Sequence, residues 1–339
     1  MTQTSTQLRR RRLLAALPLL VTGLYVRGAL ADASVRQASR SLMGTRLDMT
    51  VQADSGVDTD LAMSAAFAEM QRLVDLMSRY RIGNPVHALH LASGLQPIAV
   101  PSELLDVLQM AQAMSQRSEG AFDITVGALT AWDFTQATPI VPDATEVEHE
   151  RQLVNYRDLV INPSESTAFL RKRGMRIDLG GIAKLPILQA GMRTLHQHGI
   201  RNAMLNGGGD VVVKGQLQGR DWRIGLRDPR VPERILGTVE LNDGYVAASG
   251  DYERFFIRNG HRYHHVLDPK TGQPSTGPHG VALISRTPDG INGMGAAIMV
   301  AGAKVGRSLI APMKQVDALI VDRGEGLWLS PGMASRLHG

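Results

Sequence analysis

Cysteine is absent from this chain of 339 residues. Without a thiol the protein can form no disulfide, use no thiolate nucleophile, bind no metal through sulfur and carry no lipid on a cysteine. Two nucleotide-binding signatures are also absent. No glycine-rich segment matches the dinucleotide pattern Gly-x-Gly-x-x-Gly or the phosphate loop that ends in Gly-Lys-Ser/Thr. There is no internal repeat, so a repeat architecture is excluded as well.

The sequence also lacks an apolar run long enough for a comfortable membrane span. The best candidate, Leu13–Val26, contains Pro18 and Gly23 and is shorter than the roughly 20 residues that cross a bilayer as a helix. It follows Arg9–Arg12 and precedes Ala29-Leu30-Ala31, which is the order of an export signal with a small-residue cleavage site. We expect cleavage after Ala31, and retention as an anchor is the alternative.

Arginines directly before a modest apolar run favour a twin-arginine signal, which exports folded proteins. We therefore expect residues 1–31 to direct residues 32–339 to the periplasm. Those first 31 residues also carry the excess charge. The chain has 37 basic and 32 acidic side chains, and the leader holds five arginines and no acid, which leaves 32 of each sign. This balance gives no reason to expect a nucleic-acid partner.

The remainder is predicted to be globular, since 43% of the residues are hydrophobic and 20% are charged. Helical and strand periodicities follow one another without a regular βαβ order, which indicates an α+β fold with mixed or antiparallel sheets. The expected elements are a strand over Gln37–Val51 broken at Met43-Gly44-Thr45, helices over Asp60–Met77 and Ser102–Ser115 (the second capped by Ser102), a strand that runs into a glycine turn within Met175–Lys184 and leads to a helix opened by Pro186, strands over Val211–Val213 and Val281–Ser285, and a helix over Asn292–Ile310.

Chemically active side chains are densest between Ala247 and Pro274. Strand-forming residues at Phe255–Ile257 and Tyr263–Leu267 flank Asn259-Gly260, a dipeptide typical of a tight hairpin turn. Polar clusters at the outer ends of the two strands would lie side by side and could face one ligand. The clusters are Ser249-Gly250-Asp251 on one side and His264-His265 with Asp268 on the other. A solvated hairpin without a site is the alternative interpretation.

Seven short motifs occur in order across nearly all of residues 32–339. They are Met43-Gly44-Thr45, Met77-Ser78-Arg79-Tyr80, Gly120–Gly127, Ile177–Lys184, Gly208-Gly209-Asp210, Ser249–Arg254 and His265–Gly272. Through these motifs the sequence resembles the ApbE family, the FAD:protein FMN transferases. A chance match would have to reproduce their order as well as their composition, so the resemblance is specific.

The resemblance implies a bilobed α+β fold that binds FAD between its lobes. It also implies an activity, the transfer of FMN from FAD to a Thr or Ser hydroxyl of a partner flavoprotein, with release of AMP. Such a displacement at phosphorus needs charge neutralisation, positioning and a base for the attacking hydroxyl. In the family a divalent metal, usually magnesium, supplies much of the charge.

Individual site residues follow from matching positions in the motifs. His265 is the expected base for the hydroxyl proton, because an imidazole with a pKa near 6.5 suits that task. Asp251 and Asp268 are expected as further catalytic residues near the pyrophosphate. Strand alternation is expected to turn one of the two histidines, His264, away from the site and toward solvent. The positions that resemble FAD contacts are Met43, Tyr80, Ala121, Phe122, Asp123, Asp178, Lys184 and Leu267.

The sequence departs from the family at the metal-binding stretch. That stretch reads approximately Ala-Asp-Ala-Leu-Ala/Asp-Thr-Ala, and its first Asp and its Thr are metal ligands. Here the corresponding segment is Ile291–Ala297, where Asn292 and Ala296 replace those two ligands. With only the carbonyl of Gly181 left at its family position, magnesium should bind weakly, because the ion prefers anionic oxygen ligands.

Two main interpretations remain open, and a third is hydrolysis of FAD to FMN and AMP. In the first, the chain is an exported transferase with a weakened or relocated metal, for example at Asp289. In the second, it is an FAD-binding maturation factor for a periplasmic or membrane flavoprotein, similar to the NosX-like branch associated with nitrous-oxide reductase. The acceptor pattern Asp-x-x-Thr/Ser-Gly-Ala-Thr/Ser is broken by Gln273-Pro274 after Asp268–Gly272, so the chain does not resemble its own acceptor.

Overall fold

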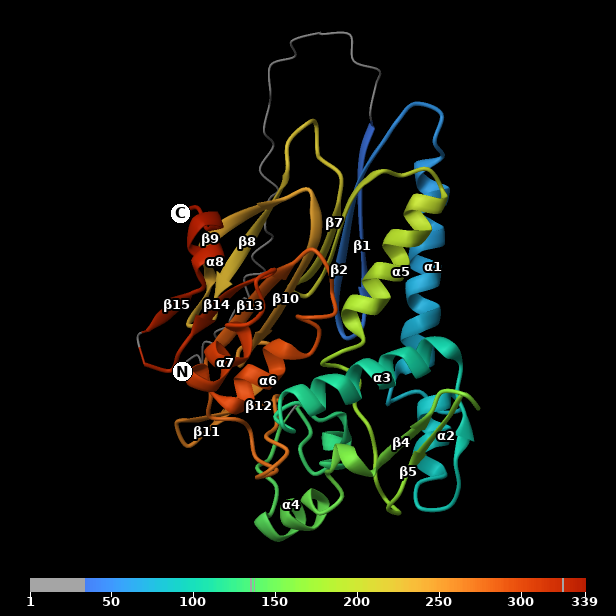
Figure 1. The fold of residues 1–339 in the computed structure, drawn as a ribbon, viewed down its shortest axis with the longest axis vertical. Coiled ribbons are helices and arrows are strands. Elements are labelled where there is room, and N and C mark those ends of the chain that lie inside the picture. Colours follow the sequence, from blue (N-terminus) through green and yellow to red (C-terminus); the bar gives the residue numbers. More distant parts are fainter. Residues whose placement is uncertain (1–33, 135, 137, 325) are drawn as a thin grey trace, which may run out of the picture. The chain divides into compact units, whose positions relative to one another are not determined.

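An eight-stranded antiparallel sheet forms the centre of the computed structural model, which describes residues 34–134, 136, 138–324 and 326–339 (Figure 1). Every neighbouring pair of strands in it is antiparallel. In spatial order the strands are β1 (Ser34–Leu42), β2 (Thr45–Ala53), β6 (Asn202–Gly207), β7 (Asp210–Lys214), β10 (Asp243–Gly250), β13 (Gly280–Ser285), β14 (Val316–Val321) and β15 (Leu327–Leu329).

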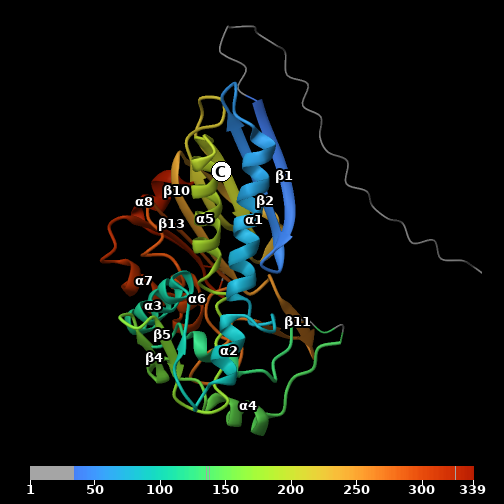
Figure 2. The same ribbon diagram turned by 90° about the vertical axis from the view of Figure 1, so that its right-hand side faces the viewer.

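Both faces of this sheet are covered. Side chains that alternate along a strand point to opposite faces, so Val212 joins the main core while Val211 and Val213 join a second core on the other side. Three helices cover the first face, and Figure 2 shows two of them, α1 and α5, side by side. The covering elements are α1 (Thr59–Met77), α5 (Lys184–Gln197) and α6 (Met294–Ala301) on the first face, and the hairpin β8 (Trp222–Asp228) and β9 (Val231–Leu241) on the second.

A smaller α/β part packs at one end of these helices. It contains the three-stranded sheet β3 (Ile98–Ala99), β5 (Thr167–Leu170) and β4 (Leu159–Asn162), with α2 (Pro85–Leu91), α3 (Ser102–Arg117), α4 (Ala144–Arg151) and the short 3-10 helices η1 (Ile124–Ala128) and η2 (Tyr156–Asp158). Buried residues of α3 and of the large sheet belong to one continuous core. Residues 32–339 therefore form one compact unit in which two parts share an interior.

The predicted α+β class, the helices α1 and α3, the strand β13 and the polar hairpin are confirmed. The hairpin consists of β11 (Phe255–Arg258) and β12 (His261–His264), and its turn residues Asn259 and Gly260 have φ of 51° and 74°, as a tight hairpin turn requires. His265–Leu267 lie beyond the end of β12 rather than in the return strand.

Five details of the prediction are wrong. Met43 and Gly44, with φ of 54° and 68°, form the turn of a β1–β2 hairpin rather than a break in one strand. Gly302, with φ of 89°, divides the expected last helix into α6 and α7 (Ala303–Ile310). The expected strand that begins at Met175 is absent. The other two errors concern boundaries: α5 begins at Lys184 before Pro186, and Ser102 is the first residue of α3 and not its cap.

The remaining element is α8 (Pro331–Arg336) at the C-terminal end. Among the described residues, no helix combines the length and the apolar character that a bilayer crossing needs. The expected export signal over residues 1–31 lies outside the described residues.

Candidate active site

The buried ring of Phe122 joins three segments that are far apart in the sequence. Gly181 and Gly293 both lie against it, because a Cβ added at either glycine would come within 3.2 Å of the ring. Gly127 lies still closer to the backbone of Ile177, where a Cβ would be 2.3 Å from the carbonyl carbon. The motifs on which these residues lie are therefore neighbours in space, at the junction of the two parts of the fold.

The contact at Gly127 predicts that this position does not tolerate a larger residue. Gly127→Ala would press a methyl group into the backbone of Ile177 and Asp178, which cannot move aside as a flexible side chain could. We expect a loss of about 1–3 kcal/mol in the free energy of unfolding and, because Asp178 is displaced, weaker FAD binding. Urea unfolding and flavin fluorescence titration measure the two effects. Gly324→Ala is the control, because Gly324 lies in open space and, like Gly127, does not have a positive φ.

Asp178 is held at the surface by two groups of the chain. Arg79 Nη1 donates to one carboxylate oxygen at 2.9 Å, and the amide of Gly180 donates to the other at 2.8 Å. Arg79 also donates to the carbonyl of Gly127 at 3.1 Å and lies 5.5 Å from the centre of the Tyr80 ring. That ring is 72% exposed, so Tyr80 offers an open aromatic face beside a fixed carboxylate.

Lys184, the first residue of α5, forms an ion pair of 2.8 Å with Asp210 at the start of β7. The other oxygen of Asp210 accepts a hydrogen bond from the amide of Ala248 at 3.1 Å. Asp210 thus positions the lysine and ties β7 to β10. Asp210 was not predicted as a site residue, although it belongs to the Gly208-Gly209-Asp210 motif.

The base of the polar hairpin completes this surface. The backbone amide of His265 donates to the carbonyl of Arg254 at 3.1 Å, and the guanidinium of Arg254 donates to the carbonyl of Gly44 at 3.4 Å. Met43 lies at the same end of the sheet, since its methyl group would be 3.1 Å from a Cβ on Gly207. Segments that are more than 200 positions apart in the sequence are therefore in direct contact here.

His265 has the properties of a base. Its Nδ1 lies 3.3 Å from the carbonyl oxygen of Arg254, an acceptor, so Nδ1 carries the proton and Nε2 of the neutral ring keeps its lone pair. The residue is exposed at the base of the hairpin. The protein atoms around the ring, and then the positive charge of Arg254, lower the pKa of His265 to about 4. The imidazole is therefore neutral at pH 7 and able to accept a proton.

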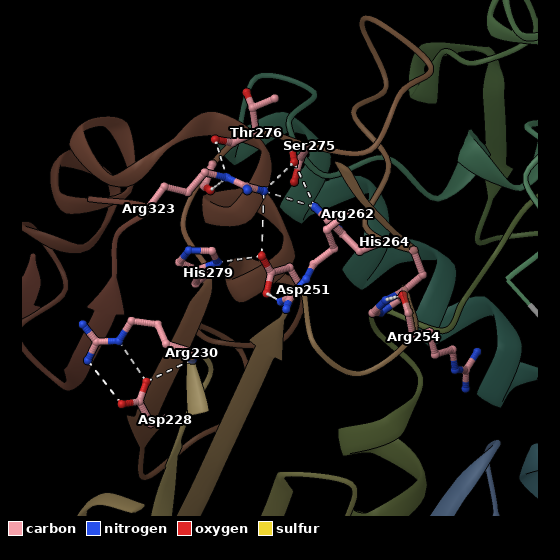
Figure 3. A network of polar contacts seen from close by, with 12 residues as sticks. Asp228, Arg230, Asp251, Arg254, Arg262, His264, Ser275, Thr276, His279 and Arg323 are labelled. Carbon is pink, nitrogen blue, oxygen red and sulfur yellow. Dashed lines mark hydrogen bonds and ion pairs between the residues drawn. The ribbon is translucent and has the colours of Figure 1, made fainter. Parts of the chain in front are cut away.

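The expectation that Asp251 takes part in the chemistry is not supported by its position. Its side chain is fully buried and accepts a hydrogen bond from Arg262 at 3.0 Å, another from His279 Nδ1 at 2.7 Å, and has Arg323 at 3.8 Å (Figure 3). Both carboxylate oxygens are occupied by cationic or polar partners of the chain. Asp251 is thus a positioning residue that joins the hairpin to the loop before β13.

His264 does not face solvent as the alternation argument suggested. It is fully buried, its Nε2 lies 2.9 Å from the carbonyl of Ser275, and burial lowers its pKa. Arg323 reaches the same carbonyl at 3.2 Å (Figure 3). The side chains of His264 and His265 point in different directions. His264 points into the interior, where Ser275 and Arg323 cover it.

Three further residues of the predicted site have structural partners. Asp123 is buried and accepts hydrogen bonds from the amide and hydroxyl of Thr125 and from the amide of Tyr156, at 2.6 to 2.8 Å. Burial raises the pKa of Asp123, and these hydrogen bonds oppose the shift.

The side chain of Asp268 accepts a hydrogen bond from the amide of Lys270 at 2.8 Å and closes a turn. Leu267 packs against the buried cluster around Trp132. Ala121 is also buried, with 7% exposure. These side chains shape the loops around the site.

The ApbE family model matches residues 43–320, which includes all seven motifs. The chain belongs to the ApbE family. It is 28% identical over 305 residues to an FAD:protein FMN transferase of Klebsiella pneumoniae, which covers 89% of this chain and 93% of that protein. An FAD:protein FMN transferase of Rhodobacter capsulatus is 33% identical over 253 residues, or 73% of this chain and 48% of that protein.

Solved structures of the ApbE family have the same fold. The ApbE protein of Thermotoga maritima superposes with a TM-score of 0.83 at 28% identity, covering 90% of this chain and 100% of that one. The flavin transferase ApbE of Vibrio cholerae gives a TM-score of 0.80 at 26% identity with the same coverage. The bilobed ApbE-type architecture predicted from the sequence is therefore confirmed.

The residues at the ApbE metal positions do not fit magnesium. Asn292 is buried, and its side-chain nitrogen donates a hydrogen bond of 2.9 Å to the carbonyl of Ile182, next to Gly181. Ala296 has no oxygen in its side chain, and Asp289 is exposed. The described part of the chain holds no group of three or more His, Asp or Glu side chains that could bind a metal ion. No catalytic step is therefore assigned to a metal here.

A second histidine near this site predicts how stability depends on pH. Nε2 of His90 accepts a hydrogen bond of 2.9 Å from the amide of Ile177, one residue before Asp178, and protonation would break that bond. Burial, and then the charges of Arg176 and Arg79, lower its pKa to about 4. The unfolded chain binds a proton below about pH 6.5 and the folded chain does not, so stability falls as pH drops from 6.5 through 4.

Urea unfolding at pH 7 and pH 5 measures this effect. We expect wild type to lose about 1–2 kcal/mol from this histidine between the two values, and His90→Gln to lose less of its stability over that interval. The exposed His198 provides a matched control, because His198→Gln should leave the pH dependence of wild type unchanged. Equal pH dependence in wild type and His90→Gln would contradict this assignment.

Proposed function

We propose that this chain transfers FMN from FAD to a Thr or Ser hydroxyl of a partner flavoprotein and releases AMP. The observation that carries the proposal is the geometry of His265, whose Nδ1 lies 3.3 Å from the carbonyl oxygen of Arg254, which leaves Nε2 free to accept a proton. A free base close to basic side chains suits the attack of a hydroxyl on a pyrophosphate. The relatives' name, FAD:protein FMN transferase, supports the same chemistry.

In the proposed step, the acceptor hydroxyl oxygen attacks the phosphorus of the FMN half of FAD. A new P–O bond forms to the acceptor, the bond between that phosphorus and the bridging oxygen breaks, and AMP leaves with the bridging oxygen. His265 Nε2 takes the hydroxyl proton, and the positive charges of Lys184 and Arg254 lower the energy of the extra negative charge. Because the imidazole is already neutral at pH 7, it needs no prior deprotonation.

Other side chains of the surface are suited to hold FAD. The open ring of Tyr80 can stack on an aromatic ring of the dinucleotide, and the fixed carboxylate of Asp178 can accept hydrogen bonds from hydroxyl or amine groups. Met43 at the β1–β2 turn lines the same end of the sheet. Together they would place the pyrophosphate near Lys184 and His265.

The loss of metal-ligand side chains at Asn292 and Ala296 favours one alternative, an FAD-binding maturation factor with little transferase activity. A chromatographic assay of AMP separates the possibilities. A transferase releases AMP from FAD only when a domain carrying the acceptor hydroxyl is present. Release without the acceptor would indicate FAD hydrolysis, and FAD binding without any release would support the maturation factor.

We also propose that the protein acts in the periplasm, on an acceptor in that compartment or at the periplasmic face of the inner membrane. Support comes from Arg9–Arg12, the apolar run Leu13–Val26 and the small residues at Ala29–Ala31. N-terminal sequencing of protein from the periplasmic fraction should begin at Asp32. Protein found only in the cytoplasm with an intact N-terminus would contradict the proposed location.

A further inference from the structure

The amide of Asn292 is oriented by its surroundings. Its nitrogen lies 2.9 Å from the carbonyl oxygen of Ile182 and 4.0 Å from the sulfur of Met110, and both of these atoms are acceptors. Turning the amide over would place its oxygen against the carbonyl oxygen, with loss of the hydrogen bond. The amide nitrogen is therefore fixed against the carbonyl of Ile182 at the position where the resemblance places a carboxylate ligand. A neutral amide offers a cation no negative charge at this position.

The backbone around Asn292 is also fixed. Gly293 has φ of 78°, and a Cβ on it would come within 3.1 Å of Met114 and 3.2 Å of the Phe122 ring. Gly295 lies against Ser249 in the same way, with a separation of 2.6 Å from the hydroxyl oxygen. The backbone at the start of α6 is therefore closely packed, which opposes a shift that would bring another oxygen to the position of the missing carboxylate.

The neighbouring carboxylates are already paired with cations of the chain. Asp178 binds Arg79, and Asp210 binds Lys184 at 2.8 Å. Neither is free to attract a divalent ion. The charge that FAD would meet on this surface must come from basic side chains, which are attracted to phosphate oxygens without any metal.

Arg254 is the basic side chain best placed for that role. Its backbone carbonyl binds His265, and its guanidinium extends to the β1–β2 turn, where a Cβ on Gly44 would lie 2.6 Å from its Nη2. Among the described residues it forms an ion pair with no carboxylate, whereas Arg262 on the same hairpin is paired with Asp251 (Figure 3). Its charge is therefore available to an anionic ligand beside the proposed base.

We propose that this chain binds FAD without a divalent metal, and that Arg254 supplies to the FAD pyrophosphate the positive charge otherwise supplied by the metal. This inference rests on the proposed function, because it concerns the same FAD site. It goes beyond that function by making the site independent of magnesium and by assigning a binding role to Arg254. A guanidinium suits this role because it stays protonated and can bind two phosphate oxygens at once.

Flavin fluorescence titrations of the purified protein, in EDTA and in millimolar magnesium, test whether FAD binds without a divalent metal. We expect the dissociation constant of FAD to agree within twofold between the two conditions. A dissociation constant that rises tenfold or more in EDTA and recovers with magnesium would overturn the inference and leave the proposed function intact. Failure to bind FAD in either condition would refute both.

Variants at Arg254 test whether this side chain supplies positive charge to the FAD pyrophosphate. Arg254→Gln should weaken FAD binding at least tenfold in both conditions, and Arg254→Lys should restore part of the loss. Arg258→Gln removes an exposed arginine from the far end of the same hairpin and should bind FAD as wild type does. Wild-type affinity in Arg254→Gln, with unchanged thermal unfolding, would overturn the assignment.

The double variant Asn292→Asp with Ala296→Thr tests the role of the amide directly. It should bind magnesium in isothermal titration calorimetry without FAD, whereas wild type should give no binding heat. FAD affinity of the double variant should then increase at least tenfold on addition of magnesium. Magnesium binding by wild type in the same calorimetric experiment would contradict the inference.

Discussion

His265→Ala is expected to lower the rate of FMN transfer by about 10²–10⁴-fold, the usual contribution of a positioned general base. FAD affinity should change only a few-fold, because the neutral imidazole contributes no charge to the pyrophosphate. AMP release and flavin fluorescence titration measure the two quantities. The reduction should be in the rate at saturating FAD, as expected when an interaction needed only in the transition state is removed.

The hairpin supplies a control for this variant. His261 lies on β12, is exposed and contacts Tyr263 edge-on, away from Arg254. His261→Ala should retain transfer activity within a few-fold of wild type. If His265→Ala retained wild-type activity as well, another group would have to accept the hydroxyl proton, and the role of His265 would be wrong.

Asp251→Asn is expected to give the largest loss of stability, about 3 kcal/mol in the free energy of unfolding. The carboxylate is fully buried, and its removal leaves Arg262, Arg323 and His279 without their common negative partner. Because those three partners are partly exposed, we expect the lower end of the range for breaking a buried ion pair. Urea unfolding at pH 7 measures the difference.

Asp243→Asn is the matched control for that experiment. It lies at the other end of β10 and forms an ion pair with Lys214 in which both side chains are about half exposed. Solvent screens such a pair, so its loss should cost less than about 1 kcal/mol. Equal losses in the free energy of unfolding would show that the ion pairs of Asp251 contribute no more stability than an exposed ion pair.

The sequence was sufficient to predict which family motifs the chain carries and several of the elements on which they lie. Glycine-rich and polar motifs mark the turns that the structure brings together, and periodicity correctly predicted α1, α3 and the β11–β12 hairpin. Local patterns succeed for these elements because each depends on contacts close in the sequence. The direction of a charged side chain depends on partners from elsewhere in the chain.

Asp123 and Asp251 illustrate that difference. Both occur in motifs that suggest a ligand site, but Tyr156 binds the first and Arg323 approaches the second, from positions tens of residues away. Asp210 shows the opposite case, since its motif was visible in the sequence but its ion pair with Lys184 depends on how β7 and α5 pack. The replacement at Asn292 was visible in the sequence, but its hydrogen bond to Ile182 required coordinates.

Intact-mass spectrometry of an acceptor domain tests the central proposal most directly. The mature protein, FAD and a domain carrying the Thr or Ser acceptor pattern are incubated together, and the acceptor is then weighed. We expect the acceptor mass to increase by one FMN unit, with no increase for an acceptor in which the hydroxyl residue is replaced by alanine. An acceptor of unchanged mass, with FAD bound and every common divalent metal supplied, would contradict the proposal that this chain is a transferase.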